Sequence, residues 1–241
     1  MTMEAYIITG ASKGIGLALS KKLAEKGHQV YGIARSFSEE WPGTKSFDFD
    51  LLKTSEIPAL IENIFGFIPG GCEIITLINN AGTITPIGFA GNNPADEISG
   101  SIALNLTAPM ITTGAFITQS ADFPSLKRII NISSGAGRNA YEGWSAYCAG
   151  KAGLDHFSLC LEKEYKDIKT MSIAPGIIDT DMQGKIRESS ETDFPMIENF
   201  KAYKEQGMLS TPEQTAEQLI RLMEREDFGD LETIADIRDY N

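Results

Sequence analysis

The chain has 241 residues, of which 42% are hydrophobic and 22% are charged, and this composition is typical of an ordinary globular protein rather than a disordered or fibrous one. Its formal net charge of −12 disfavours nucleic acid or an anionic membrane as the main partner. The three cysteines have no CxxC spacing, and we see neither a signal peptide nor an apolar run long enough to cross a bilayer. We therefore expect a soluble protein of the cytoplasm.

Short apolar runs rich in β-branched residues alternate along the chain with segments of helical periodicity. The apolar runs predict strands at 5–9, 29–34, 45–49, 73–79, 127–133 and 169–174. The periodic segments predict helices at 14–26, 54–66, 97–119, 145–165 and 212–225. Strands that are apolar on both faces and separated by helices indicate a parallel sheet with helices on both faces, a three-layer α/β fold. No linker divides the chain, so we expect one domain over residues 1–241.

The segment 183–211 is the exception to this alternation, because it is polar and only weakly periodic. A long excursion after the last central strands often forms a lid over a binding site. We expect a substrate lid here; a solvated surface insertion is the alternative.

The stretch "TGASKGIG" at 9–16 follows the first predicted strand and opens the first predicted helix. Gly10 would permit a tight turn, Gly14 a close approach of the backbone to a phosphate, and Gly16 close packing of helix on sheet. The amino terminus of a helix also offers unpaired N–H groups to an anion. The stretch therefore predicts a dinucleotide site, although its GxxxGxG spacing differs from the common GxGxxG.

The end of the second predicted strand reads Ala34-Arg35, where an NAD enzyme would carry an acidic residue for the ribose hydroxyl. A guanidinium there suits a 2′-phosphate, and Lys13 adds a second cation. We predict NADP(H) as the cofactor, the alternative being that both are surface charges. Asp50 ends the next strand, where it would reach the adenine, and the small residues of "NNAG" at 79–82 would let the cofactor lie against the backbone.

Tyr147 and Lys151 are four residues apart in a predicted helix, so their side chains share one face at about 5–6 Å between Cβ atoms. A phenol with a pKa of about 10 is a poor acid–base catalyst near neutral pH. Lowering it by ~3 units requires roughly 4 kcal/mol, which one cation at ~4 Å supplies in an effective dielectric of ~20. We therefore expect the Lys151 ammonium to lower the pKa of the phenol.

Two further strand ends complete a candidate catalytic site. Ser134 follows the fifth predicted strand, where its hydroxyl would donate a hydrogen bond to a substrate carbonyl while Tyr147 delivers the proton. The stretch "APGIIDTDM" at 174–182 follows the sixth strand, and its Thr180 would hold the carboxamide of a nicotinamide.

In order and spacing, these motifs resemble those of the short-chain dehydrogenase/reductase family over residues 5 to about 182. The resemblance implies a Rossmann-type sheet, hydride transfer from a nicotinamide and a Ser134–Tyr147–Lys151 site, with Asn105 supporting a proton-relay water and Lys151 also holding the ribose hydroxyls. It also implies a homodimer through the helices that contain 105–119 and 147–165. The expected cofactor-binding residues are Thr9, Gly10, Ser12, Lys13, Gly14, Ile15, Gly16, Ala34, Arg35, Asp50, Leu51, Asn79, Ala81, Gly82, Tyr147, Lys151, Pro175, Gly176, Ile178, Thr180 and Met182.

A narrower likeness is to the sepiapterin reductases and the bacterial benzil reductases, through Gly143-Trp144, Tyr147-Cys148 and the run 179–183. The pattern of Asp236 and Asp239 is similar to the carboxyl-terminal segment in which sepiapterin reductases hold the pterin ring, and this implies substrate binding by Asp236. An ordinary surface position for Asp236 is the alternative. The expected substrate-binding residues are Ser133, Ser134, Tyr147, Gly176, Met182 and Asp236.

We therefore predict an NADPH-dependent carbonyl reductase for an α-dicarbonyl or a pterin side-chain ketone. Both substrates place a carbonyl beside another carbonyl or imine, so one pocket would serve either. A 3-oxoacyl thioester reductase is the alternative among enzymes, and a non-catalytic NADP(H)-binding regulatory protein is the alternative of another class. The two histidines, His28 and His156, are too few and too far apart to predict a metal site.

Overall fold

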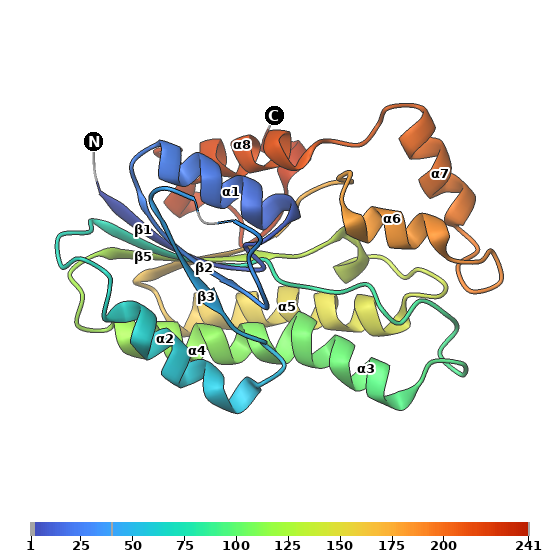
Figure 1. The fold of residues 1–241 in the computed structure, drawn as a ribbon, viewed down its shortest axis with the longest axis horizontal. Coiled ribbons are helices and arrows are strands. Elements are labelled where there is room, and N and C mark those ends of the chain that lie inside the picture. Colours follow the sequence, from blue (N-terminus) through green and yellow to red (C-terminus); the bar gives the residue numbers. More distant parts are fainter. Residues whose placement is uncertain (1–2, 40, 241) are drawn as a thin grey trace.

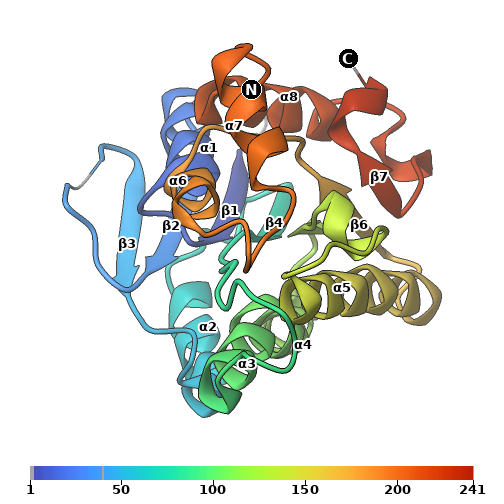
Figure 2. The same cartoon turned by 90° about the vertical axis from the view of Figure 1, so that its right-hand side faces the viewer.

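A computed structural model describes residues 3–39 and 41–240, and a seven-stranded sheet runs through the centre of the molecule (Figures 1 and 2). All neighbouring strands pair in parallel, in the order β3-β2-β1-β4-β5-β6-β7. The strands are β1 (Glu4–Thr9), β2 (Gln29–Ala34), β3 (Thr44–Asp48), β4 (Ile74–Asn79), β5 (Leu126–Ile132), β6 (Ile168–Ala174) and β7 (Ile234–Asp236). The central strands are almost wholly buried, whereas the edge strand β3 is partly exposed, which is why its sequence is more polar.

Helices cover both faces of this sheet (Figure 1). On one face lie α1 (Gly14–Glu25) and α8 (Pro212–Met223), and on the other α2 (Ile57–Phe65), α4 (Ala108–Ser120) and α5 (Ser145–Glu164). Neighbouring strand residues alternate between the two cores, because Ile8 packs with α1 and α8 while Ile7 packs with α2 and α4. The predicted three-layer Rossmann-type fold is therefore confirmed.

The predicted strands agree with the observed ones to within one residue at each end, but β7 was not predicted. With three residues it is too short to show a strand period. Weak periodicity also hid two helices in this part of the chain: α6 (Asp181–Glu188), which begins just before segment 183–211 and runs into it, and α7 (Ile197–Glu205), which lies within it. Both are short and largely polar, and they gain their stability from packing on an aromatic cluster described below.

The predicted helix 97–119 is a composite in the structure. It begins as α3 (Ala95–Ile102), widens to a π-helical turn over Ala103–Thr107 and continues as α4. By length and composition the span Ala95–Ser120 would be able to cross a membrane, a test that core helices also pass. Ala108 and Phe116 of this span are buried against the sheet.

The strand order reverses beside β1, which pairs with β2 on one side and with β4 on the other. In an open parallel sheet, a crevice forms at the carboxyl ends of the strands at such a reversal, because the connections leave to opposite faces. Thr9 and Asn79 end the two strands that border this point. The fold therefore brings the candidate motifs together at the carboxyl ends of the strands.

Candidate active site

The glycine loop lies at the end of β1, where only glycine fits. Gly10 has a φ of +68°, and a Cβ on it would lie 2.9 Å from the Cα of Ala81. A Cβ on Gly16 would lie 2.3 Å from the carbonyl oxygen of Gly10. Side chains at these two positions would therefore push the loop away from the sheet or the helix.

The loop is fastened to the end of β4 by Asn80. The Asn80 side-chain amide donates to the carbonyl oxygens of Thr9 (3.0 Å) and Gly10 (3.2 Å). In return, the Thr9 hydroxyl accepts from the backbone N–H groups of Asn80 (2.9 Å) and Ala81 (3.1 Å). Asn80 belongs to the sequence motif "NNAG" but is not among the predicted site residues, and only the folded chain shows that it joins the two strand ends.

Asn79, the residue before it, lies in a different environment. Its amide donates to Thr113 (3.1 Å) and Asn131 (2.9 Å), in a buried network that continues to Ser158 of α5. The Asn79 side chain therefore ties β4 to the helices below the sheet and does not point into the crevice. A contact of its main chain with the cofactor stays a prediction.

The cradle at the start of α1 fits a dinucleotide phosphate. Lys13 precedes the helix, and its side chain does not cap the first N–H groups of the helix. Ser12 is half-buried, while Ile15 packs into the core below. A pyrophosphate at this position needs backbone N–H donors and glycines without side chains to let it approach. The residues present therefore fit the dinucleotide phosphate that the sequence predicts.

Two cations follow or belong to the elements that form this cradle. Arg35 is exposed directly after Ala34, the last residue of β2, and has no ion-pair partner among the residues that the structure describes. Lys13 instead pairs with Asp181 at the start of α6 (3.0 Å), although both side chains are well exposed. Exposed pairs of this kind contribute little and are readily exchanged, so Lys13 is available to a competing anion.

The third strand contributes a turn beside Arg35. Asp50 is half-buried and accepts a hydrogen bond from the backbone of Leu52 (3.0 Å), while Leu51 is buried between them. The bond fixes the Asp50 carboxylate close to its own main chain. An adenine contact by Asp50 and Leu51 stays a prediction.

The predicted catalytic residues meet at the end of β5 and the start of α5. Tyr147 lies in the first turn of α5, close enough to Ser134 for the Ser134 hydroxyl to lower the pKa of the phenol. One turn later, the Lys151 ammonium donates to the carbonyl oxygen of Ile132 (2.8 Å) and lies 5.9 Å from the Tyr147 ring centre. Ser133 is buried beside them, and its hydroxyl has no hydrogen-bond partner among the described residues.

Burial is the largest influence on the pKa of Tyr147 and on that of Lys151. Burial raises the pKa of Tyr147, and the Ser134 hydroxyl only partly opposes this. Burial also lowers the pKa of Lys151 to about 8, with the charge of Asp155 acting in the opposite direction. The expectation of a lowered phenol pKa is therefore wrong for this structure, because desolvation of the phenolate outweighs the lowering by Ser134. A phenol that stays protonated near neutral pH is nevertheless a competent proton donor.

Asn105 lies in the π-helical turn, a local widening that often marks functional positions. Its side chain accepts from the backbone N–H of Thr83 (3.0 Å) and donates to the carbonyl oxygen of Thr83 (2.8 Å). A Cβ on Gly82 would lie 2.9 Å from the Asn105 side-chain oxygen and 3.7 Å from the Lys151 nitrogen. Asn105, Gly82 and Lys151 are therefore neighbours, and the role of Asn105 in proton relay stays a prediction.

The segment after β6 closes one side of the crevice. Pro175 leads into Gly176, whose φ of +82° turns the chain, and Ile178 bridges to Ser210. Thr180 then precedes α6, and its methyl would lie 3.5 Å from a Cβ on Gly14. The start of α6 therefore reaches the glycine loop across the crevice.

An aromatic cluster lies between α5 and the segment 183–211. Trp144 stacks on Phe194 with ring centres 4.5 Å apart and an interplanar angle of 7°, and it meets Tyr147 edge-on at 5.8 Å. Met182 of α6 and Tyr141 pack against the same cluster. Trp144 therefore packs against segment 183–211 and also contacts Tyr147.

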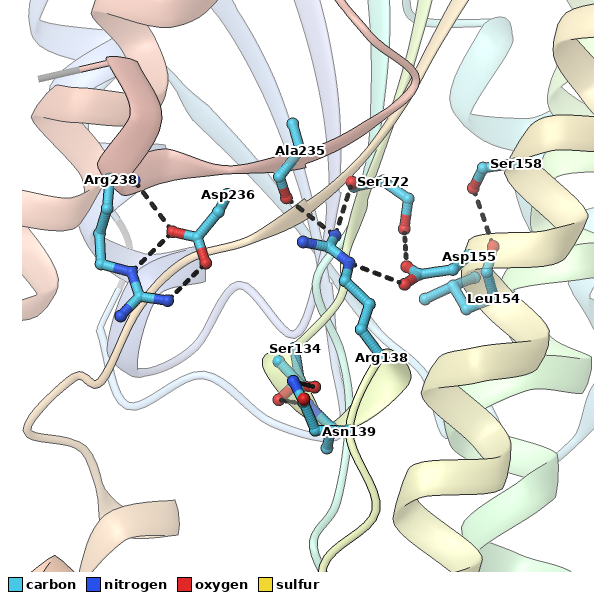
Figure 3. A network of polar contacts seen from close by, with 12 residues as sticks. Ser134, Arg138, Asn139, Leu154, Asp155, Ser158, Ser172, Ala235, Asp236 and Arg238 are labelled. Atoms are coloured by element: carbon cyan, nitrogen blue, oxygen red, sulfur yellow. Dashed lines mark hydrogen bonds and ion pairs between the residues drawn. The ribbon is translucent and has the colours of Figure 1, made fainter.

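Asp236 is the last residue of β7 and pairs with Ala174, the last residue of β6. It therefore lies at the carboxyl ends of the strands, as the other candidate residues do. Its carboxylate accepts from the Arg238 guanidinium at 2.8 and 2.7 Å and from the Arg238 backbone at 3.0 Å (Figure 3). These bonds hold the pKa of Asp236 below its usual range. Both carboxylate oxygens are therefore engaged by Arg238, an arrangement that the sequence pattern did not reveal.

Comparison with known proteins relates this site to a family. Residues 4–191 match the family model of the short chain dehydrogenases. The benzil reductase ((S)-benzoin forming) of Bacillus subtilis (strain 168) is 41% identical over 229 residues, covering 92% of this chain and 94% of its own. The sepiapterin reductase of Mus musculus is 32% identical over 241 residues, with 92% of each chain covered.

Among solved structures, the KRED1-Pglu enzyme is similar, with a TM-score of 0.82 and 28% identity over 97% of this chain and 100% of that one. The family binds nicotinamide cofactors, which agrees with the glycine cradle. From its matched family, its relatives and its fold, this chain belongs to the short-chain dehydrogenase/reductase family and is an oxidoreductase that acts on CH–OH and C=O groups.

Proposed function

We propose that the protein is an NADPH-dependent carbonyl reductase whose substrate is an α-dicarbonyl compound. One observation carries the proposal: the buried Tyr147 phenol, with Ser134 acting on it, lies one helical turn from the buried Lys151 ammonium. The names of the relatives support the substrate class, because the Bacillus protein that is 41% identical is a benzil reductase. The 32% identity to sepiapterin reductase supports the same reaction on a related carbonyl.

The choice of NADPH rests on the end of β2. Arg35 is exposed there and unpaired among the described residues, and Lys13 is tied only by an exposed ion pair. A planar guanidinium binds two phosphate oxygens at once, which a ribose hydroxyl would not require. The backbone of the glycine loop would hold the pyrophosphate, and Lys151 the nicotinamide ribose.

The reduced nicotinamide, when bound, supplies the hydride. The chain then has to bind and protonate the carbonyl oxygen. Ser134 donates a hydrogen bond to that oxygen, and Tyr147 donates the proton, because its raised pKa keeps the phenol protonated until the oxygen becomes basic. Lys151, held by Ile132, stabilises the resulting phenolate, and the Asn105 turn supports proton return from water. Donors of this kind typically contribute ~10²–10³ in rate.

We further propose that 183–211 acts as the substrate lid. Phe194 and Phe200 of this segment pack on Trp144, which contacts Tyr147, so closure of the segment would exclude water from the phenol. Arg187 of α6 and Lys204 of α7 both pair with Asp179, which links the two lid helices to the strand end. Gly176 and Met182 would then border the bound substrate, together with Ser133.

An aromatic diketone is favoured over a pterin by the state of Asp236. A carboxylate that recognises an amino-pyrimidine must offer both oxygens to the ring, but here Arg238 binds them. A pterin would have to displace Arg238, whose side chain is 67% exposed and therefore free to leave. Sepiapterin remains the second candidate because Asp236 reaches the edge of the sheet where the site lies.

The test is NADPH oxidation against benzil, 1-phenyl-1,2-propanedione, sepiapterin and an acetoacetyl thioester. We expect the two aromatic diketones to give the highest kcat/KM. A preference for the thioester would instead support a 3-oxoacyl reductase. Tight NADPH binding with no reduction of any of the four would support a non-catalytic NADP(H)-binding protein.

The expected homodimer remains a proposal, built on the helices α4 and α5. Met110 of α4 is a large apolar side chain that is exposed in the single chain. Sedimentation of the purified protein tests it: a mass near 52 kDa, twice the chain mass of 26.2 kDa, is expected, and a monomer would reject it.

A further inference from the structure

The turn that follows Ser134 ends in an arginine that reaches three separate elements (Figure 3). Arg138 donates through Nε to Oδ2 of Asp155 on α5 (3.3 Å). Through Nη2 it donates to the carbonyl oxygen of Ala235 on β7 (2.8 Å) and, at longer range, to that of Ser172 on β6 (3.5 Å). One guanidinium therefore joins the turn to a helix and to two strands.

Asp155 is buried, with 7% of its surface exposed, and both of its oxygens have partners. Oδ2 accepts from Arg138, and Oδ1 accepts from the hydroxyl of Ser172 (2.6 Å). A buried carboxylate is tolerated only when it is paired and hydrogen-bonded. Asp155 is therefore committed to this network, and it is not a free base for the reaction.

The turn itself is pressed against α5 at the same point. A Cβ on Gly137 would lie 2.8 Å from Oδ2 of Asp155 and 3.0 Å from the carbonyl oxygen of Lys151. At the other end of the turn, the Ser134 hydroxyl accepts from the backbone N–H of Ala136 (3.1 Å). The position of Ser134 thus depends on the turn 135–137. The ion pair between Arg138 and Asp155 holds this turn against α5.

Asp155 also lies one helical turn beyond Lys151, on the same face of α5. Its charge raises the pKa of Lys151 against the lowering by burial. The other groups around the Lys151 nitrogen are the Ile132 carbonyl, which accepts from it, the Tyr147 ring, and the neighbouring Gly82. Asp155 is therefore the one charged group that acts on Lys151 among the described residues.

We propose that Arg138 and Asp155 are positioning residues of the active site, whose ion pair, closed by Ser172, fixes the Ser134 turn against α5 and sets a buried negative charge one turn from Lys151. Neither residue touches the reacting atoms; they act through Ser134 and Lys151. The kinetic part of this inference rests on the carbonyl reductase function proposed above. The electrostatic part does not, because it concerns the free protein.

The kinetic test is a double-mutant cycle of Arg138→Met and Ser134→Ala with benzil as substrate. In the wild-type background, we expect Arg138→Met to lower kcat by about 10-fold and to leave the KM for NADPH unchanged. In the Ser134→Ala background, the same substitution should lower kcat by less than about 2-fold. Arg138→Lys should recover part of the loss. Arg225→Met, which breaks the exposed Arg225–Asp227 pair, is the matched control and should leave kcat unchanged. Equal losses in both backgrounds would overturn the role of Arg138.

The second test needs no substrate. The titration of Lys151 is followed by NMR of ¹³Cε-labelled lysine, with its signal assigned by its loss in Lys151→Arg. We expect Asp155→Asn to lower the pKa of Lys151 by about one unit or more, and Asp155→Glu, which keeps the charge, to shift it less. An unchanged Lys151 titration in folded Asp155→Asn would overturn the role of Asp155. If Asp155→Asn does not fold, Ser172→Ala must reduce kcat in the same direction as Arg138→Met, and full activity of Ser172→Ala would refute the network.

Discussion

Phe194→Ala tests whether the aromatic cluster holds segment 183–211 closed. The Phe194 side chain is fully buried, stacks on Trp144 at 4.5 Å and meets Phe200 edge-on at 5.4 Å. Truncation of a buried phenylalanine costs about 3–5 kcal/mol. Because the segment packs mainly on this cluster and not in the two cores of the sheet, we expect most of that cost to appear as local opening of the lid rather than as global unfolding.

The assay combines kinetics with hydrogen exchange. An opening free energy that falls by about 3 kcal/mol increases the exchange of the α6 and α7 amides by roughly 100-fold while the strands stay protected. The KM for benzil should rise, and the melting temperature should change little. Phe67→Ala, at an exposed phenylalanine after α2, is the matched control and should alter neither quantity. A loss of protection spread evenly over the sheet, or an unchanged KM, would refute the reasoning.

Three further predictions concern charged groups. Arg35→Asp should raise the KM for NADPH by about 10-fold or more and that for NADH little, because only NADPH carries the 2′-phosphate; equal effects in initial-rate measurements would overturn the cofactor assignment. The pKa of Lys151 is 10.5 in the unfolded chain and about 8 in the folded protein. Between these two pH values the unfolded state binds more protons, so the free energy of unfolding should rise with pH. Lys151→Met should lack that rise in urea titrations at pH 8 and pH 9.5, and an identical slope in both proteins would contradict the burial of the ammonium. Asp236→Ala should raise the KM for sepiapterin but hardly that for benzil, and equal effects on both would remove the pterin argument.

The sequence predicts the sheet well because its strands are continuous β-branched runs. It also places the candidate catalytic residues near one another, because Ser134 follows the strand β5 and Tyr147 and Lys151 share one face of the next helix, α5. Ser134, Tyr147 and Lys151 are brought together as expected, since β5 and α5 are neighbours in any parallel arrangement of this order. Local patterns are sufficient for these parts. The short strand β7 and the lid helices were missed because their stability comes from partners distant in sequence.

The network around the site is not visible in the sequence for the same reason. Arg138 meets Asp155 17 residues away and Ala235 97 residues away, and no local spacing marks either contact. The direction of the Tyr147 pKa shift also depends on packing in the folded protein, because burial of the phenol, with Trp144 against its ring, raises that pKa. A distance along a helix predicts that an ammonium is near the phenol, but it cannot predict how strongly the surroundings penalise the phenolate.

The central claim is that Tyr147 donates the proton to the reduced carbonyl, and Tyr147→Phe tests it most directly. The substitution removes one oxygen and leaves the ring against Trp144, so the fold and NADPH binding should be retained. Single-turnover NADPH oxidation with benzil should slow by about 10²-fold or more, while the Kd for NADPH, measured by fluorescence, stays within about 3-fold. Oxidation at the wild-type rate by a folded, NADPH-binding Tyr147→Phe protein would contradict the account.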